Sequence, residues 1–194
     1  YSSDNYVVDI SGNGGYIIVG SDSYPVYLFG KDSNEPIWSY NTGDEVNSVA
    51  ISSDGEYIVV GTLDDNSETV VYLFSRYSNT PIWTRDFDCG VRSLDISSDG
   101  NYIAVGYCNK IQLFNKNSSS PVWSYSASDN VKEISISADG KFISGVTINN
   151  NDSPYNLKLL LFSNGSSNPL WTYTIEGSVE LNSGDILSMS LDGK

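Results

Sequence analysis

The chain has 194 residues, with 24 acidic and 10 basic side chains, no histidine and a formal net charge of −14. This excess of acid argues against binding to nucleic acid or to anionic membrane surfaces, because both need Lys and Arg. Without histidine the chain lacks a histidine-based catalytic base and any histidine-ligated metal, and no other catalytic constellation is visible. No apolar stretch reaches the length of about 18 residues that a membrane-spanning helix needs.

The first predicted unit, residues 6–40, contains four short apolar runs separated by turn residues. An Asn13-Gly14 pair stands between the first two runs, at 6–11 and 16–20, and the other two follow at 26–29 and 36–40. Asn-Gly or Asp-Gly between apolar runs is a strong β-hairpin signal, because the turn needs a positive φ angle. The unit is therefore predicted to form one four-stranded antiparallel sheet.

The same unit recurs along the chain, at residues 46–85, 91–125 and 131–175, and a partial copy follows at 186–194. Each copy carries an Asp-Gly turn, and Trp38, Trp83, Trp123 and Trp171 mark equivalent places 45, 40 and 48 residues apart. A period of about 40–50 residues with four strands per unit is typical of β-propeller blades. The sequence thus predicts an all-β β-propeller of four four-stranded antiparallel blades plus the first strand of a fifth.

Three residue types recur at fixed places within the units. A glycine closes the second strand (Gly20, Gly61, Gly106 and Gly145), where it suits a bend or a close backbone approach. A proline begins the fourth strand, which marks that strand as the outermost because proline lacks a ladder donor (Pro36, Pro81, Pro121 and Pro169). The tryptophan is interpreted as packing between blades, with a row of ligand-stacking indoles as the alternative.

Residues 46–62 resemble the first two strands of a WD-repeat blade, and 71–74 with 81–84 are similar to the outer strands of PQQ-like repeats. The chain departs from the WD pattern because it has no Gly-His pair, and Leu73-Phe74 replaces the Trp-Asp that ends the third strand. It also lacks the adjacent cysteines and calcium-liganding acids of PQQ-dependent dehydrogenases. The resemblance is to the propellers of archaeal and bacterial extracellular proteins, and it implies neither the WD tetrad nor a PQQ cofactor.

Propellers of these families close with seven or eight blades, so the four units leave three arrangements open. The chain is a segment of a longer propeller, or two copies form an eight-bladed ring. As the third arrangement, a four-bladed ring closes alone, with the strand around Ile186 completing the first blade. Blades bury their apolar faces against neighbours, so an open arc leaves two faces exposed.

The chain has two cysteines, Cys89 and Cys108, which lie on either side of the hairpin formed by residues 91–106. Antiparallel pairing around Asp99-Gly100 places them nearly opposite each other, so a disulfide and two free thiols both remain possible. A disulfide would indicate an oxidising compartment. Metal binding by the pair is not predicted, because no His or further Cys is present.

Acidic residues gather in the loops that share one rim of a propeller, and these loops are the candidate binding surface. The candidates are Asp44, Glu45, Asp64, Asp65, Asp88, Asp129 and Asp152. A solvated acidic rim is the simpler interpretation, and calcium binding is the alternative. The loops 64–66 and 149–152 are richest in oxygen ligands, although neither has the spacing of an EF-hand loop.

Three Asn-x-Ser triplets in predicted loops are possible glycosylation sites, at Asn117, Asn151 and Asn164. Together these features predict a non-enzymatic binding or scaffold propeller at the cell surface, with a cytoplasmic location as the alternative. Its expected partner is a protein or a glycan. Further propeller blades are a second expected partner, supplied by the same longer chain or by a second copy. The rival functions are a structural repeat module of a surface layer or filament, and an enzymatic propeller whose active site lies in other blades.

Overall fold

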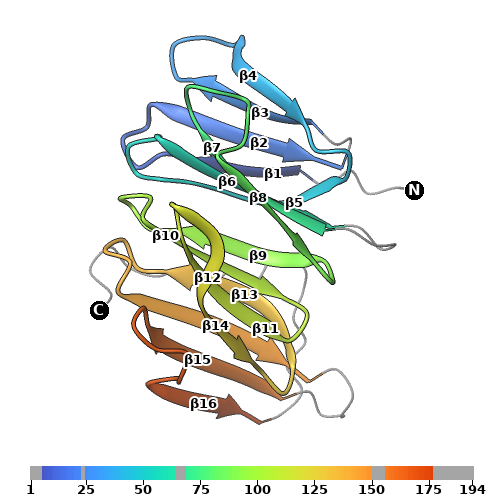
Figure 1. Ribbon diagram of the computed structural model, residues 1–194, viewed down its shortest axis with the longest axis vertical. Helices are drawn as coiled ribbons and strands as arrows, with labels where there is room; N and C mark the ends of the chain where they lie inside the picture. Colours follow the sequence, from blue (N-terminus) through green and yellow to red (C-terminus); the bar gives the residue numbers. More distant parts are fainter. Residues whose placement is uncertain (1–5, 23–24, 64–68, 150–155, 177–194) are drawn as a thin grey trace.

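Four antiparallel sheets make up the part of the chain that the computed structural model describes, residues 6–22, 25–63, 69–149 and 156–176 (Figure 1). The first sheet contains β1 (Tyr6–Ile10), β2 (Tyr16–Ser21), β3 (Pro25–Gly30) and β4 (Pro36–Asn41), and the second contains β5 (Glu45–Ile51), β6 (Tyr57–Leu63), β7 (Thr69–Ser75) and β8 (Trp83–Phe87). The third contains β9 (Val91–Ile96), β10 (Tyr102–Tyr107), β11 (Lys110–Asn115) and β12 (Ser118–Ser126), and the fourth contains β13 (Asn130–Ile136), β14 (Phe142–Ile148), β15 (Leu157–Ser163) and β16 (Trp171–Ile175).

The predicted all-β class with four-stranded antiparallel blades is confirmed, and no helix occurs in these described ranges. The predicted partial fifth blade, at 186–194, lies outside them. In every sheet the strands are hydrogen-bonded in chain order, so the first and fourth strands are the two edges. The first strands β1, β5, β9 and β13 lie side by side in succession, which places the propeller axis along them.

Each sheet starts with a hairpin whose turn is organised by a buried serine. The Ser97 hydroxyl donates a hydrogen bond to Asp99 Oδ1 at 2.7 Å and accepts one from the Tyr102 N–H at 3.0 Å. Gly100 follows with a φ of +69°, a conformation that costs glycine little. Ser11, Ser52 and Ser137 make the same bonds in the other sheets, so the predicted turns at 13–14, 54–55, 99–100 and 139–140 are confirmed.

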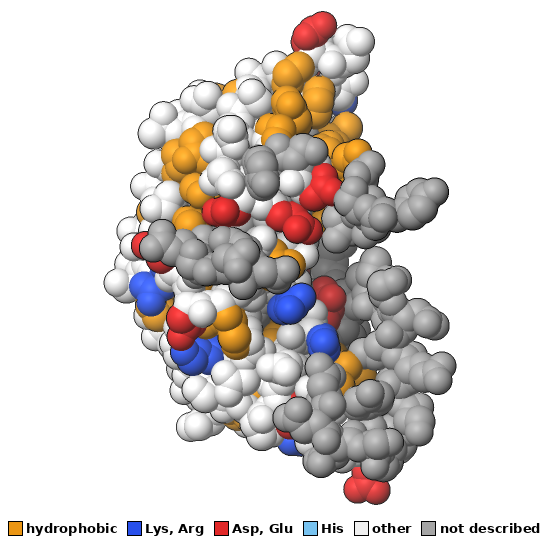
Figure 2. All heavy atoms as spheres, turned by 90° about the vertical axis from the view of Figure 1, so that its right-hand side faces the viewer, with side chains coloured by type: hydrophobic (Ala, Val, Ile, Leu, Met, Phe, Trp, Pro, Cys, Tyr) orange, Lys and Arg blue, Asp and Glu red, His pale blue; other side chains and the backbone are white. Residues whose placement is uncertain are grey.

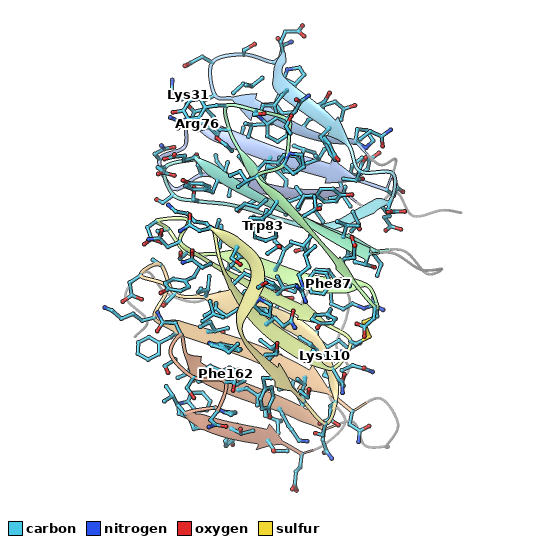
Figure 3. The ribbon with its side chains drawn as sticks, viewed as in Figure 1. Lys31, Arg76, Trp83, Phe87, Lys110 and Phe162 are labelled. Atoms are coloured by element: carbon cyan, nitrogen blue, oxygen red, sulfur yellow. A yellow bond between two sulfur atoms is a disulfide. The ribbon has the colours of Figure 1, made fainter. Side chains whose placement is uncertain are left out.

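The hydrophobic core lies between successive sheets rather than inside any one of them. The Trp38 ring lies 5.3 Å from that of Phe74 in the next sheet, and its indole N–H donates to the Arg76 carbonyl at 2.9 Å. Trp83 with Phe114, and Trp123 with Phe162, repeat this contact at 5.9 Å and 5.4 Å, again with a 2.9 Å indole hydrogen bond. The predicted packing role is confirmed for these three tryptophans, and Figure 3 shows Trp83 between the second and third sheets.

A second contact between sheets leaves no room for a Cβ atom at three of the four turn glycines. A Cβ atom on Gly100 would lie 2.4 Å from the ring of Tyr57, which belongs to the preceding sheet. Tyr16 lies in the same way beneath Gly55, and Tyr102 beneath Gly140. Gly14, in the first sheet, has open space around it because no sheet precedes it in the described part of the chain.

Two predicted details differ in the structure. Gly145 does not match Gly20, because a Cβ on Gly145 would meet Ile111 of the preceding sheet, whereas one on Gly20 would meet Val46 of the following sheet. Gly145 is one residue closer to its turn, and a shift of one residue reverses the face on which a strand residue lies. Of the four prolines predicted to begin the fourth strands, only Pro36 does so, because Pro81 and Pro169 lie two residues before β8 and β16. Pro121 lies inside β12, at an irregularity in the β11–β12 register, where a missing N–H is tolerated.

Candidate interaction surfaces

A groove of about 710 Å³ runs along the axis and is lined by residues of all four first strands. Most of its wall is apolar or hydroxyl-bearing, but three carboxyl side chains also line it: Asp9, Asp95 and Glu133. None of the three is among the residues predicted for a binding site. Asp9 and Asp95 each interrupt an apolar run, as in Leu94-Asp95-Ile96, and that interruption is the signal in the sequence that could have identified these two.

The Asp95 carboxylate joins the third sheet to the fourth. It accepts hydrogen bonds from the Ile136 N–H at 2.8 Å and from the Ser135 hydroxyl at 3.1 Å, both in β13, and from its neighbour Ile96. Burial raises the pKa of Asp95 to about 6, although these hydrogen bonds act in the opposite direction. Asp9 joins the first sheet to the second through the Ile51 N–H at 2.9 Å, and burial raises its pKa too.

Serine side chains perform the same task at other places along the groove. The Ser48 hydroxyl accepts from the Leu94 N–H at 3.2 Å, and the Ser93 hydroxyl accepts from the Ile134 N–H at 3.1 Å. Ser93 also donates to Glu133 at 3.0 Å, and burial raises the pKa of this glutamate. A first strand is a sheet edge with unpaired N–H groups, and a buried N–H needs an acceptor. These polar groups of the groove therefore hold blades together.

The predicted acidic rim lies where an outer strand connects to the next first strand. Asp44 lies between β4 and β5, and Glu45 is the first residue of β5. Asp88 lies between β8 and β9, and Asp129 lies between β12 and β13. Figure 2 looks toward this end of the molecule and shows basic side chains among the acidic ones. The remaining candidates, Asp64, Asp65 and Asp152, lie outside the described residues.

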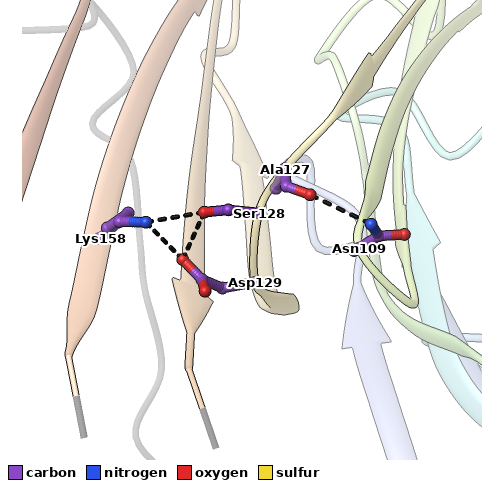
Figure 4. A network of polar contacts seen from close by, with 5 residues as sticks. All are labelled: Asn109, Ala127, Ser128, Asp129 and Lys158. Atoms are coloured by element: carbon purple, nitrogen blue, oxygen red, sulfur yellow. Dashed lines mark hydrogen bonds and ion pairs between the residues drawn. The ribbon is translucent and has the colours of Figure 1, made fainter. Parts of the chain in front are cut away.

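Two of the rim carboxylates are paired with lysines. Lys158 Nζ donates to Asp129 Oδ2 at 2.6 Å and to the Ser128 hydroxyl at 2.7 Å, and Ser128 donates to Asp129 in turn (Figure 4). Burial acts to raise the pKa of Asp129, but the Lys158 and Ser128 bonds outweigh it and lower that pKa. Asp88 pairs with Lys110 at 3.3 Å. The rim of the third and fourth sheets therefore has less free negative charge than its sequence suggests.

Cys89 and Cys108 form a disulfide with their Cα atoms 6.2 Å apart. It links the β8–β9 connection to the β10–β11 turn, and Figure 3 shows it as the yellow bond near Phe87 and Lys110. The Tyr107–Val91 pair lies immediately inside the two cysteines. The predicted hairpin register is what brings them together.

Two of the three Asn-x-Ser triplets lie in the described part of the chain. Asn117 is exposed in the turn between β11 and β12, so its amide is open to solvent. Asn164 is half-buried after β15, and its carbonyl accepts the Trp123 indole hydrogen bond. Asn151 lies outside the described residues.

The calcium hypothesis rests on the loops 64–66 and 149–152, of which only Asn149 is described. Within the residues that are described, no group of three or more Asp, Glu, His or Cys side chains could hold a metal ion. Those same residues include no helix long and apolar enough to cross a membrane.

The first and fourth sheets each present an apolar face that no described residue covers. On the first sheet Val8 and Ile10 are 68 % and 57 % exposed. On the fourth, Trp171 and Tyr173 are 47 % and 63 % exposed, although Trp171 is the equivalent of three packed tryptophans. Hydrophobic side chains also gather toward the top of Figure 2, at the end formed by the first sheet.

Four-stranded antiparallel sheets that follow one another about a shared axis define a β-propeller. A family model described as "WD domain, G-beta repeat" matches residues 34–67 and 80–115, and this match supports a WD-repeat-like propeller. Each match begins near the outer strand of one sheet and ends within the next sheet, so one sequence repeat spans two blades. No curated protein matches the sequence significantly.

Among solved structures, the fold is similar to that of hydrazine synthase from Kuenenia stuttgartiensis, with a TM-score of 0.71 and 17 % sequence identity. The match covers 87 % of this chain and 48 % of the hydrazine synthase chain, so this chain spans about half the length of that structure. At such identity the likeness concerns the fold alone.

Proposed function

We propose that this chain is a non-enzymatic interaction scaffold whose first partner is another propeller blade. The WD-repeat propeller fold suggests a protein-interaction module, which supports the general part of this proposal. The specific part rests on the match between the two exposed end faces, one on the first sheet and one on the fourth. They are the two halves of an interface that occurs three times inside the molecule.

At each internal interface, one sheet contributes what we call the donor face, because its tryptophan donates a hydrogen bond to the next sheet. This face also carries the aromatic ring at the start of the second strand. The opposing acceptor face has a phenylalanine, a backbone carbonyl two residues after it, and a turn glycine. The fourth sheet presents a donor face with Trp171 and Phe142. The first sheet presents an acceptor face with Phe29, the Lys31 carbonyl and Gly14. The acceptor face of one copy therefore matches the donor face of another.

Burial of such faces is favourable, because each large apolar side chain removed from water contributes about 1.5–3 kcal/mol. A head-to-tail contact closes into a ring if its rotation closes, and otherwise continues as a filament. Two copies of four blades would give an eight-bladed ring, whereas an open array corresponds to the structural module considered above.

The mass of the native chain in solution, measured by light scattering after gel filtration, tests this proposal. We expect twice the 21.2 kDa of one chain for a ring, and larger, concentration-dependent species for an array. Val8→Glu, on the acceptor face, should return the mass to that of one chain. Ile82→Glu is the matched control, because Ile82 is 48 % exposed and lies just before β8 in the second sheet, which forms neither end face. A single-chain mass at every concentration would refute the second copy as partner.

We also propose that the protein acts outside the cytoplasm, where protein or glycan partners would meet its rim. The Cys89–Cys108 disulfide supports this location, since such bonds persist in oxidising compartments. The exposed Asn117 triplet agrees with it. Fractionation of the producing cells, with the chain detected by antibody, tests the location, and recovery in the cytosol alone would refute it.

A further inference from the structure

Basic side chains are few in this acidic chain, and nearly all described ones have a partner. Lys31, Lys110, Lys141 and Lys158 form ion pairs with carboxylates. Arg76 and Arg85 donate to backbone carbonyls, and Lys116 lies over the Tyr57 ring. Within the described residues, Arg92 and Lys132 alone have no hydrogen bond, ion pair or ring contact from their side chains.

These two side chains line the same small pocket. It has a volume of about 170 Å³ and lies at the rim, between the third and fourth sheets, beside the Cys89–Cys108 disulfide. Asn130 adds an amide to its wall, and the lining contains no carboxylate. The side chains of the pocket therefore offer several hydrogen-bond donors, and no carboxylate in the lining accepts hydrogen bonds from them. Arg92 and Lys132 also carry like charges, which repel each other unless an anion lies between them.

Irregular backbone explains why both residues belong to this pocket. The β9–β10 register shifts between Ser93 and Val91, and the β13–β14 register shifts between Val131 and Glu133. Arg92 and Lys132 are the extra residues at these two β-bulges, and a bulge redirects its side chain away from the normal alternation. The same position in the second sheet carries Asn47, whose amide donates to the carbonyls of Val91 and Arg92.

The frame around the pocket is held by covalent and hydrogen bonds. The disulfide fixes Cys89 to Cys108, and the Val131 N–H donates to the Cys108 carbonyl at 2.6 Å. The rim carboxylates next to Cys89 and Asn130 in the sequence are paired with other residues, Asp88 with Lys110 and Asp129 with Lys158. The chain therefore provides a fixed pocket with two cations and does not itself neutralise them.

We propose that this pocket binds a small oxyanion, a carboxylate or phosphate group, between Arg92 and Lys132. A guanidinium group presents parallel N–H donors that match two oxygens of such an anion, and the lysine ammonium adds a point charge. The Asn130 amide supplies a further donor. The inference is independent of the proposed function, because neither cation lies on an end face.

The test is a titration of the isotope-labelled native chain with sodium phosphate, and separately with glutarate, followed by NMR at constant ionic strength and pH. We expect saturable shifts of the Gly90 and Asn130 amide signals, with at least one of the two anions. The double variant Arg92→Gln/Lys132→Gln should weaken binding by about tenfold or more, as expected when charge-assisted bonds are lost. The anion that saturates at lower concentration identifies the preferred group.

The control double variant is Lys31→Gln/Lys141→Gln, which removes the same charge from residues that do not line the pocket. It should keep the wild-type affinity, and the dispersion of the NMR spectrum shows whether each variant is folded. The proposal is overturned if neither anion gives saturable shifts, or if both double variants weaken binding equally. Unchanged binding in Arg92→Gln/Lys132→Gln would overturn it as well.

Discussion

Asp95 accepts a 2.8 Å hydrogen bond from the backbone N–H of Ile136, across the boundary between the third and fourth sheets. Asp9 and Ile51 make the corresponding contact between the first and second sheets. The edge strands around the axis would otherwise expose unpaired N–H groups. Neighbouring blades are thus joined by carboxylates near the axis and by tryptophan contacts near the outer strands.

Replacing Asp95 with Asn should change how stability depends on pH. Burial raises the pKa of Asp95 from 3.8 to about 6, so the native state binds this proton more tightly than the unfolded state. The resulting stabilisation is complete below the unfolded value and is lost as pH rises through about 6. Relative to Asp95→Asn, the wild type should gain about 2 kcal/mol of unfolding free energy as the pH falls from about 7 to 4.

Urea unfolding of both proteins across this pH range measures that difference. Burial also raises the pKa of Asp9 and Glu133, while Asp99, Asp129 and Asp139 have lowered pKa values. These groups are present in both proteins, so their contributions largely cancel in the comparison. A difference that stays constant with pH, or grows as pH rises, would contradict the assignment.

Trp83→Ala and Trp171→Ala should differ in their effect on stability, although the residues are equivalent in the repeat. Trp83 packs on Phe114 and donates to the Lys116 carbonyl, so its loss should cost about 3 kcal/mol or more. Trp171 is 47 % exposed, and its loss should cost less than about 1 kcal/mol in the single chain. Denaturant unfolding at low protein concentration measures both, and equal losses would disprove the distinction.

Gly100→Ala should destabilise the protein more than Gly14→Ala. Both glycines have positive φ angles, +69° and +66°, so each variant bears a backbone cost of about 1 kcal/mol. Only Gly100 has a ring against it, with Tyr57 at 2.4 Å from the added Cβ, so this variant must also displace part of the core. The thermal midpoints of the two variants provide the comparison. Similar midpoints would mean that Tyr57 moves aside without cost.

Reduction of the Cys89–Cys108 bond should lower the free energy of unfolding by about 3 kcal/mol, the value expected for a closed loop of this size. The cysteines are 19 residues apart. Unfolding curves with and without reductant give the loss, and the Cys89→Ser/Cys108→Ser variant should match the reduced protein. Alkylation of the native, unreduced chain should add no label, whereas the uptake of two labels would show free thiols.

The repeat could be predicted from sequence because its determinants are local. The Ser-x-Asp-Gly turn around Ser97 needs only residues close in the chain, and it recurs wherever the sequence has the same pattern. Strand order follows from short connections between antiparallel neighbours. The disulfide partners could be placed opposite each other for the same reason, since one hairpin fixes their register.

The binding surface was harder to predict because charge in the sequence does not give pairing in space. Asp129 and Lys158 are 29 residues apart, and the pairing of β14 with both β13 and β15 brings them together. Arg92 and Lys132 look like isolated cations in sequence, and two bulges in different sheets place them in one pocket. Asp9 and Asp95 were missed because a repeat indicates blades but not which groups cross between them.

The sequence by itself determined the blade, since alternation, turn chemistry and the spacing of tryptophans are written along the chain. Only the tertiary structure decided how blades face one another, because that depends on side chains far apart in the chain, as where Trp38 meets Phe74. The same packing decided which face of each blade remains exposed. A face that is buried in three copies is open in the fourth because no described residue packs against it.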